Sequence, residues 1–359
     1  MGKIGHVTSP LHYGKAPKWL FERMKSLARY IIIAMREEFS EDIILEKLSD
    51  PYWFQCLGCV LGFDWHSSGL GTTVCGALKE GIKGYEKEIG IFIAGGKGKV
   101  SRRTPEEITF WCEKTGISGD KLIYSSRMSA KVDSSAIQDG YKLYHHSFFF
   151  TAKGKWAVIQ QGMNEENKMA RRYHWLGDKV ESFVCQPHSG IAADRIEQKI
   201  LNLVDRESEE CRKASVSIAN TEPSKILKEF YGSKFLLLPS RHEIRSEDID
   251  SKKIHKILLS TYEQAPENFE ELLAIRGVGE KSLRALALLS ELLYGKPPSF
   301  NDPARFSFAH GGKDGTPYPV DRRTYDFSIE VLKRAIEMSK LGNREKIESI
   351  KKLAYFYNF

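Results

Sequence analysis

Apolar residues in the first fifty positions recur at helical spacing. The set from Trp19 to Ile31 repeats about every 3.6 residues, and a second set follows at Ile43, Ile44 and Leu48. Residues 51–77 differ, because they are nearly uncharged and rich in glycine, cysteine and aromatic side chains. We therefore predict amphipathic helices followed by a segment that is largely buried.

Two later stretches have the pattern of strands. Residues 89–96 form an apolar run that ends in two glycines, which is typical of a buried strand leading into a turn. Residues 144–163 hold two β-rich runs on either side of Ala152-Lys153-Gly154 and predict a hairpin. Between these stretches, Pro105 and the acids after it indicate a helix that begins near Thr104.

After Gly190 the pattern is helical. Helical spacing covers residues 191–215, 223–231, 251–264, 268–274, 281–294, 321–341 and 344–356. We expect an α+β domain with a small mixed or antiparallel sheet over residues 1–190, where any catalytic site would lie. A helical linker over 191–222 and an all-α domain over 223–359 would follow.

The sharpest motif lies between two of these helices, at Arg276-Gly277-Val278-Gly279 followed by Lys281 and Ser282. The glycines allow a tight turn, and the backbone N–H groups of the turn and of the next helix then face outward. Such groups bind a phosphate without reading its base. The motif resembles the helix-hairpin-helix of DNA repair and replication proteins, which implies DNA binding. The alternative is an ordinary two-helix turn with a glycine cap.

The resemblance to DNA glycosylases with this motif extends to two further residues. Those enzymes place a lysine two positions after the second glycine and an aspartate in a later Val-Asp pair, which Lys281 and Asp321 match here. This implies that Lys281 forms a Schiff base and that Asp321 assists proton transfer. However, the spacing is longer than usual, and the cysteines of the iron–sulfur cluster are absent. In the alternative, Asp321 caps a helix and Lys281 touches only phosphate.

Composition narrows the class of protein. The 359 residues are 41% hydrophobic and 28% charged, as in ordinary globular proteins, and the net charge of +7 is not concentrated in a tail. No apolar run is long enough for a membrane helix, no secretory signal is recognisable, and six cysteines are too few for a disulfide scaffold. We therefore expect a soluble cytoplasmic protein whose contacts with nucleic acid are local.

Polar groups that could carry chemistry gather at three places in the N-terminal half, around residues 62–69, 127–146 and 160–175. The candidate catalytic residues are Asp64, His66, Asp133, Asp139, His145, His146 and His174. The carboxylates of Asp64, Asp133 and Asp139 could hold a divalent ion, Mg or Mn, that activates water at a phosphodiester. The side chains of Lys131, Arg171 and Arg172 could neutralise DNA phosphates. The alternative is a set of buried polar residues in an irregular core.

The spacing of these candidates constrains how they could meet. Asp133, Asp139 and His145 are too far apart along one strand to share a metal ion, so the chain must turn between them, most naturally at Gly140. Since His145 and His146 point to opposite faces of one strand, only one of them can line a cleft.

Two further motifs are weaker. Cys56-x-x-Cys59 has no second pair at zinc spacing, so buried cysteines are the preferred interpretation. Residues 95–99 lack the full form of a phosphate-binding loop, and we interpret them as a basic loop beside a nucleic acid backbone.

Several longer stretches resemble a known family. The segments PLHYGKAPKWLFERM, DPYWFQCLGCVLGFDWHSSG, SRMSAKVDSSAIQDGYKLYHHSFFF and ARRYHW are similar to the family catalogued as domain of unknown function 763, found largely in thermophilic archaea and bacteria. The likeness spans nearly the whole chain and carries no settled mechanism. It implies a novel N-terminal domain joined to a DNA-binding helical domain, in a nuclease or repair factor.

Three functions follow as hypotheses. The first is a metal-dependent deoxyribonuclease with little sequence preference, in which the N-terminal residues cleave and the hairpin grips the DNA backbone. The second is a DNA glycosylase or abasic-site lyase that uses Lys281 and Asp321. The third is a non-catalytic DNA-binding adaptor.

Overall fold

The fold is described from a computed structural model, for residues 16–63, 68–193, 196–198, 200–232, 251–304 and 306–307, and for the single positions 330, 334 and 337. Its centre is a six-stranded sheet in the order β1-β3-β4-β5-β6-β8. The strands are β1 (Ile91–Lys97), β3 (Lys142–Thr151), β4 (Trp156–Asn164), β5 (Met169–Leu176), β6 (Gly190–Ala193) and β8 (Phe306–Ser307). Neighbours pair antiparallel except for β6 and β8, which pair parallel, so the sheet is mixed.

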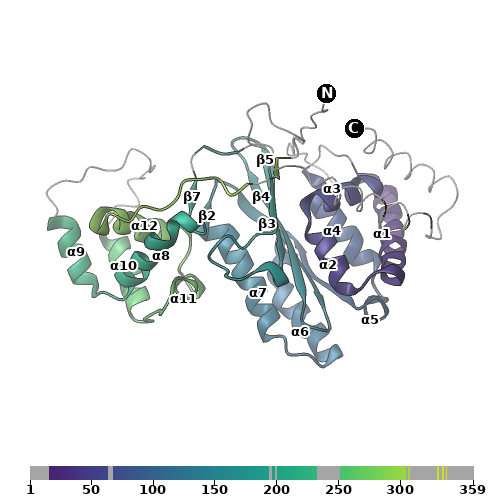
Figure 1. The fold of residues 1–359 in the computed structure, drawn as a ribbon, viewed down its shortest axis with the longest axis horizontal. Coiled ribbons are helices and arrows are strands. Elements are labelled where there is room, and N and C mark those ends of the chain that lie inside the picture. The colour runs from purple at the N-terminus through teal and green to yellow at the C-terminus, as the bar shows by residue number, and fades with distance from the viewer. Residues whose placement is uncertain are drawn as a thin grey trace.

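Helices from the N-terminal part cover both faces of this sheet (Figure 1). One face packs against α1 (Lys18–Glu38), α2 (Glu41–Ser49), α3 (Pro51–Val60) and α4 (Gly69–Gly81), with the short α5 (Glu86–Ile89) at its side. Phe149, Ile159 and Leu176 of the sheet join the apolar core on this face. The other face packs against α6 (Thr104–Thr115) and α7 (Asp120–Lys131), and Phe148, Phe150 and Val158 lie in the core there.

The sequence patterns predicted these elements well. The helical spacing of residues 19–48 corresponds to α1 and α2, and the apolar segment that follows forms the largely buried α3 and α4. The predicted hairpin is β3 and β4, joined by a turn in which Gly154 has φ +79°, in the region that favours glycine. The predicted turn at Gly140 is also present, with φ +83°.

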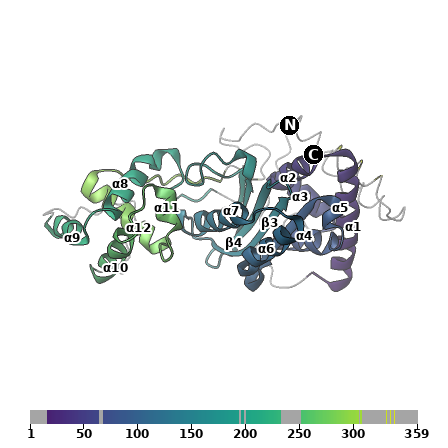
Figure 2. The same ribbon diagram turned by 90° about the horizontal axis from the view of Figure 1, so that it is seen from below.

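The C-terminal helices form a separate group at one end of the molecule (Figure 2). They are α8 (Glu209–Ala219), α9 (Pro223–Gly232), α10 (Ser251–Tyr262), α11 (Phe269–Ala274) and α12 (Glu280–Tyr294). The helices predicted over 321–341 and 344–356 fall almost wholly outside the described residues, and only positions 330, 334 and 337 are seen to be helical. None of the described helices is both long and apolar enough to cross a bilayer.

The predicted helical linker over residues 191–222 is wrong in its first part. Residues 190–193 form β6, and β7 (Leu201–Asn202) pairs with β2 (Ile137–Gln138) in a second small sheet. Strand β8, within the predicted C-terminal domain, returns to the central sheet beside β6. Strands this short carry no detectable periodicity, which is why the sequence pattern missed them.

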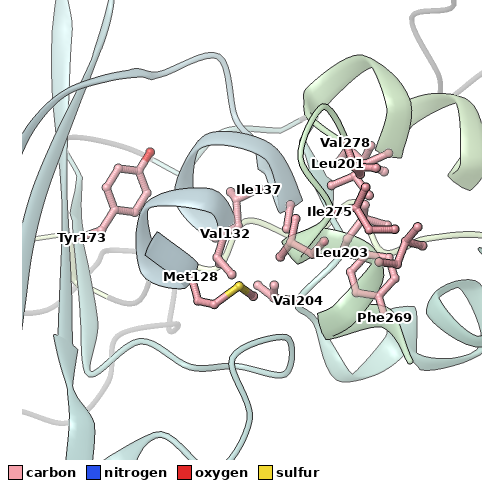
Figure 3. Packing of buried hydrophobic residues seen from close by; sticks show 14 of the residues in the cluster. Met128, Val132, Ile137, Tyr173, Leu201, Leu203, Val204, Phe269, Ile275 and Val278 are labelled. Carbon is pink, nitrogen blue, oxygen red and sulfur yellow. The ribbon is translucent and has the colours of Figure 1, made fainter. Parts of the chain in front are cut away.

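The apolar core continues from the sheet into the helical group (Figure 3). Met128 and Val132 lie in the same cluster as Leu203 and Val204, and as Phe269 and Ile275 beside the C-terminal hairpin. A polar contact also joins the sheet-containing part to the helical group. The Tyr124 hydroxyl of α7 donates to a carboxylate oxygen of Glu270 in α11 at 2.6 Å. The two parts of the chain are therefore packed against each other.

Candidate functional site

Three residue doublets in adjacent strands place the same polar groups on both faces of the sheet. They are His145-His146 in β3, Gln160-Gln161 in β4 and Arg171-Arg172 in β5. Since successive side chains of a strand point to opposite faces, each doublet contributes one member to each side. Register pairs His146 with Gln160, and His145 with Gln161, across β3 and β4.

Asp133 is the centre of the network on the α7 side. It lies in η2 (Val132–Ala136), a π-helical turn that continues α7, and its side chain is fully buried. Its Oδ2 accepts hydrogen bonds from Gln160 Nε2 at 2.5 Å and from Trp175 Nε1 at 2.9 Å. Its Oδ1 lies 2.5 Å from His188 Nε2. Burial raises the pKa of Asp133, and this increase is opposed by the nearby His188.

His146 extends this network to α7. Its Nδ1 lies 2.9 Å from Gln160 Oε1, and its Nε2 lies 2.9 Å from the Ser126 hydroxyl. His146 and Asp133 are thus connected through the two ends of one glutamine side chain. The sequence predicted that one histidine of the pair would line a cleft near Asp139. In the structure both are buried, and His146 is linked to Asp133 instead.

His188 was not among the predicted site residues. It lies in the loop two residues before β6, and its side chain is 7% exposed. Its Nε2 faces Asp133, whereas its Nδ1 makes no hydrogen bond to any residue that the structure describes. The sequence signal that could have identified it is the Pro187-His188-Ser189-Gly190 loop directly before a strand.

A second buried network is built on Arg171. Its guanidinium donates to Asp139 Oδ2 at 2.9 Å and to both carboxylate oxygens of Asp302, at 3.0 and 2.7 Å. The Tyr173 hydroxyl also donates to Asp139, at 2.7 Å. Asp302 was not predicted either, because 131 residues separate it from Arg171. Its signal was the Asn301-Asp302-Pro303 turn sequence.

The two networks reach the wall of one cavity of about 100 Å³. The cavity is lined by Gln186, His188, Gly190, Ile191, Asn202, Val204, Asp205, Asp302 and Pro303. His188 brings the Asp133 network to its wall, and Asp302 brings the Arg171 network. This cavity is the candidate active site.

None of the predicted catalytic residues that are described lines the cavity directly. Asp133 reaches it through His188, and Asp139 reaches it through Arg171 and Asp302. His145 and His174 lie on the opposite face of the sheet, where His174 Nε2 is 2.7 Å from Arg172 Nε. Asp64, His66 and Asp321 lie outside the described residues.

The three cations predicted to contact phosphates, Lys131, Arg171 and Arg172, all have partners within the protein. Arg171 and Arg172 are buried within the sheet, one ion-paired and the other donating to the Pro51 carbonyl, so a DNA backbone cannot reach them. Lys131 Nζ donates to the carbonyls of Leu273 and Ile275, both at 2.6 Å. Its charge therefore stabilises the C-terminal end of α11.

Asp133 and Asp139 do not fit a shared metal ion. Their oxygens accept hydrogen bonds from amide, indole, phenol and guanidinium donors, which leaves no pair of oxygens facing a common cation. Within the described ranges, no three His, Cys, Asp or Glu side chains are arranged to hold a metal ion. Cys56 and Cys59 are buried and form no disulfide, as the sequence predicted.

The hairpin between α11 and α12 presents an open turn. Arg276, Gly277 and Lys281 are exposed, whereas Val278 is buried beneath them. Gly277 has φ +96°, and a Cβ on Gly277 or Gly279 would meet no atom within 4 Å. No side chain of the N-cap residue Gly279 caps the N-terminus of α12, which is the end of a helix that attracts anions.

Comparisons with known proteins give one match. The chain is similar, over residues 5–320, to a family described as "Protein of unknown function (DUF763)". No curated protein and no solved structure matches it.

Proposed function

Since the chain belongs to the DUF763 family, whose description assigns no activity, we propose a function from the site itself: hydrolysis of phosphodiester bonds in DNA. The observation that carries this proposal is the Asp133–His188 pair, whose histidine lines the cavity while the carboxylate lies behind it. A buried carboxylate that orients an imidazole is a recurrent arrangement for general acid–base chemistry.

The pair supports a defined proton transfer. With His188 Nε2–H donating to Asp133, the lone pair of the ring is on Nδ1, which is not engaged by any described residue. Nδ1 would accept a proton from water as the water oxygen attacks phosphorus. The phosphorus–oxygen bond to one sugar then breaks, and the leaving sugar oxygen takes up a proton from solvent. Asp133 would then stabilise the imidazolium, because the buried carboxylate holds the new charge within hydrogen-bond distance.

The hairpin supplies the substrate-binding part of the proposal. Exposed Arg276 and Lys281, together with the first N–H groups of α12, would bind a backbone phosphate without reading bases. The hairpin contacts the segment that carries Asp133. Gln138 Nε2 donates to the Glu280 carbonyl at 2.8 Å, and Lys131 Nζ donates to the Ile275 carbonyl. Lys131 and Gln138 flank the π-helical turn that carries Asp133.

The divalent ion stays a separate prediction. The imidazole base needs no shared metal between Asp133 and Asp139, so any Mg or Mn would be brought by the phosphate or bound elsewhere. Cleavage measured with and without a chelator decides whether an ion takes part.

The test uses His188→Gln and Asp133→Asn in the full chain. We expect DNA cleavage to fall about 10²- to 10⁴-fold while DNA affinity stays unchanged. His255→Gln, an exposed histidine on α10, is the control and should cleave at the wild-type rate. Because Asp133→Asn could weaken the fold, the less buried His188→Gln carries the conclusion. Cleavage by His188→Gln at the wild-type rate would refute the proposal.

The other hypotheses correspond to other outcomes. A covalent protein–DNA adduct trapped by borohydride, and lost in Lys281→Gln, would replace hydrolysis by a lyase reaction. DNA binding without cleavage of any DNA substrate would identify an adaptor.

A further inference from the structure

The sequence between β1 and α6 exposes a group of cations that the proposed function does not use. It is η1 (Gly98–Arg103), a 3₁₀ segment that follows Lys97 at the end of β1. Lys97, Lys99, Arg102 and Arg103 are all exposed. We call these four residues the η1 cations.

Most of the η1 cations have no acidic partner. Arg103 pairs with Glu106 at 3.4 Å, but Lys97, Lys99 and Arg102 have no carboxylate within ion-pair distance in the described part of the chain. The nearby Glu107 does not compensate them, because it accepts from Lys79 Nζ at 2.6 Å and from the Gly95 N–H at 2.8 Å. Uncompensated positive charge is therefore concentrated in one short segment.

Aromatic side chains lie beside these cations. Lys97 Nζ is 5.6 Å from the centre of the Tyr144 ring. Further along α6, Phe110 is 47% exposed, contacts Trp111 edge-on, and carries Lys114 Nζ at 4.1 Å over its ring. Positions 103, 106, 110 and 114 follow one face of the helix, because residues three and four apart are neighbours there. Arg103, the last of the η1 cations, therefore shares a helix face with the exposed ring of Phe110 and with Lys114, with Glu106 between them.

We infer that η1 and the outer face of α6 bind single-stranded nucleic acid, with the η1 cations on the phosphates and Phe110 stacked on a base. Cations that follow a backbone, next to an exposed aromatic ring, are the combination that such binding needs. An anionic membrane would instead require an apolar face that inserts. The inference rests on the proposed function for its substrate class and adds a second binding surface beside the hairpin.

The test measures binding of a labelled oligothymidylate of about 20 nucleotides to the full chain, in the presence of a chelator and over a range of salt concentrations. In the Lys99→Gln/Arg102→Gln double variant, the slope of log affinity against log salt should fall by about 1.4, or roughly 0.7 for each cation removed. The matched control is Lys83→Gln/Lys87→Gln, which removes two exposed cations near the other end of β1. It should leave the slope unchanged.

Phe110→Ala tests the aromatic part separately. Affinity should fall about fivefold or more, because a stacking contact is lost, while the salt slope stays as in the wild type. An unchanged slope in the Lys99/Arg102 variant, or an equal loss in the Lys83/Lys87 control, would overturn the inference. The inference would also be overturned if the same variants lost binding to phosphatidylserine vesicles but kept wild-type binding to the oligonucleotide.

The outcome is independent of the cleavage test. Loss of oligonucleotide binding in the η1 variants together with wild-type cleavage by His188→Gln would sustain this surface and refute the hydrolase mechanism. The reverse pattern would refute the surface alone.

Discussion

His145 and His146 are adjacent in the chain, yet β3 directs their rings to opposite faces of the sheet, and both are buried. Burial, together with charge repulsion from His146, Lys97 and Lys79, lowers the pKa of His145 to about 3. Burial also lowers the pKa of His146 to about 4, although the bond to Gln160 opposes the shift. Both rings are therefore neutral at pH 7.

These two histidines should make the fold sensitive to mild acid. A folded-state pKa below the unfolded value means that stability is complete above the unfolded pKa, near 6.5, and is lost as pH falls toward the folded value. Between pH 7 and pH 5 we expect each histidine to cost about 2 kcal/mol of unfolding free energy. His146→Gln should remove about 2 kcal/mol of the pH dependence, as measured by urea unfolding at the two pH values. Equal pH dependence in wild type and variant would contradict this expectation.

The candidate site could be predicted only in part from the sequence. Strand alternation correctly separated His145 from His146, because the period of a strand is a local property. His188 and Asp302 lie in loops and meet their partners across 55 and 131 residues, so no local spacing relates them to the site. Arg171 and Arg172 were assigned to the surface because a sequence does not show that a strand is buried on both sides.

At the scale of elements, the π-helical turn η2 connects the two parts of the proposed site. It carries Asp133, and it contacts α12, whose first turn belongs to the hairpin. π-Helical turns are rare and frequent at functional sites. If DNA binding displaces the hairpin, we therefore expect the π-helical turn and the side chain of Asp133 to move with it.

The two hairpin glycines should respond differently to substitution. Gly277 has φ +96°, so Gly277→Ala should cost about 1–2 kcal/mol of stability. Gly279 has φ −143°, an extended conformation that any residue adopts. A side chain at this position therefore causes no backbone strain, although the glycine lies in a tight turn. Gly279→Ala should keep wild-type stability but weaken DNA binding, because its methyl group would occupy the space that a phosphate approaches.

Thermal unfolding and gel-shift titration at fixed salt check both variants. Wild-type DNA affinity in a stable Gly279→Ala protein would remove the hairpin from the binding surface.

The long periodic elements were predictable, whereas the short ones were not. Helices such as α1 and α12 repeat their apolar positions over several turns, so their pattern is unambiguous. Strands β7 and β8 have two residues each and exist because tertiary pairing holds them. The strands within residues 190–222, β6 and β7, were missed for this reason.

At the scale of the whole molecule, the segment after α12 connects the C-terminal helices to the central sheet. The Asn202 N–H donates to the Ser299 carbonyl at 2.9 Å, Asp302 neutralises Arg171, and β8 pairs with β6. Residues 299–307 thus complete a sheet that begins more than two hundred positions earlier. The N-terminal part is not a closed unit without them.

Removing the ion pair between Asp302 and Arg171 should destabilise the central sheet. Asp302→Ala removes one of the two buried carboxylates that pair with Arg171 in the described part of the chain, and breaking a buried ion pair costs about 3–5 kcal/mol. Asp178→Ala, which removes an exposed partner of Lys155, should cost less than about 1 kcal/mol. Urea unfolding followed by tryptophan fluorescence, to which the buried Trp175 of β5 contributes, distinguishes the two. Similar losses in both variants would show that Arg171 does not depend on the C-terminal segment.

The doublets in β3, β4 and β5 also bear on how the chain finds its register during folding. In most strands a slip by one residue exchanges polar and apolar faces and is strongly rejected. Here a slip brings histidine to a histidine position, glutamine to glutamine and arginine to arginine, and the run Phe148-Phe149-Phe150 behaves likewise. The strands therefore discriminate poorly against misaligned intermediates. The turns between the strands must therefore set the correct register. The Thr151–Lys155 turn, with Gly154 in the left-handed region, does so for β3 and β4. An exposed glycine in a turn therefore contributes to the register of the buried layer.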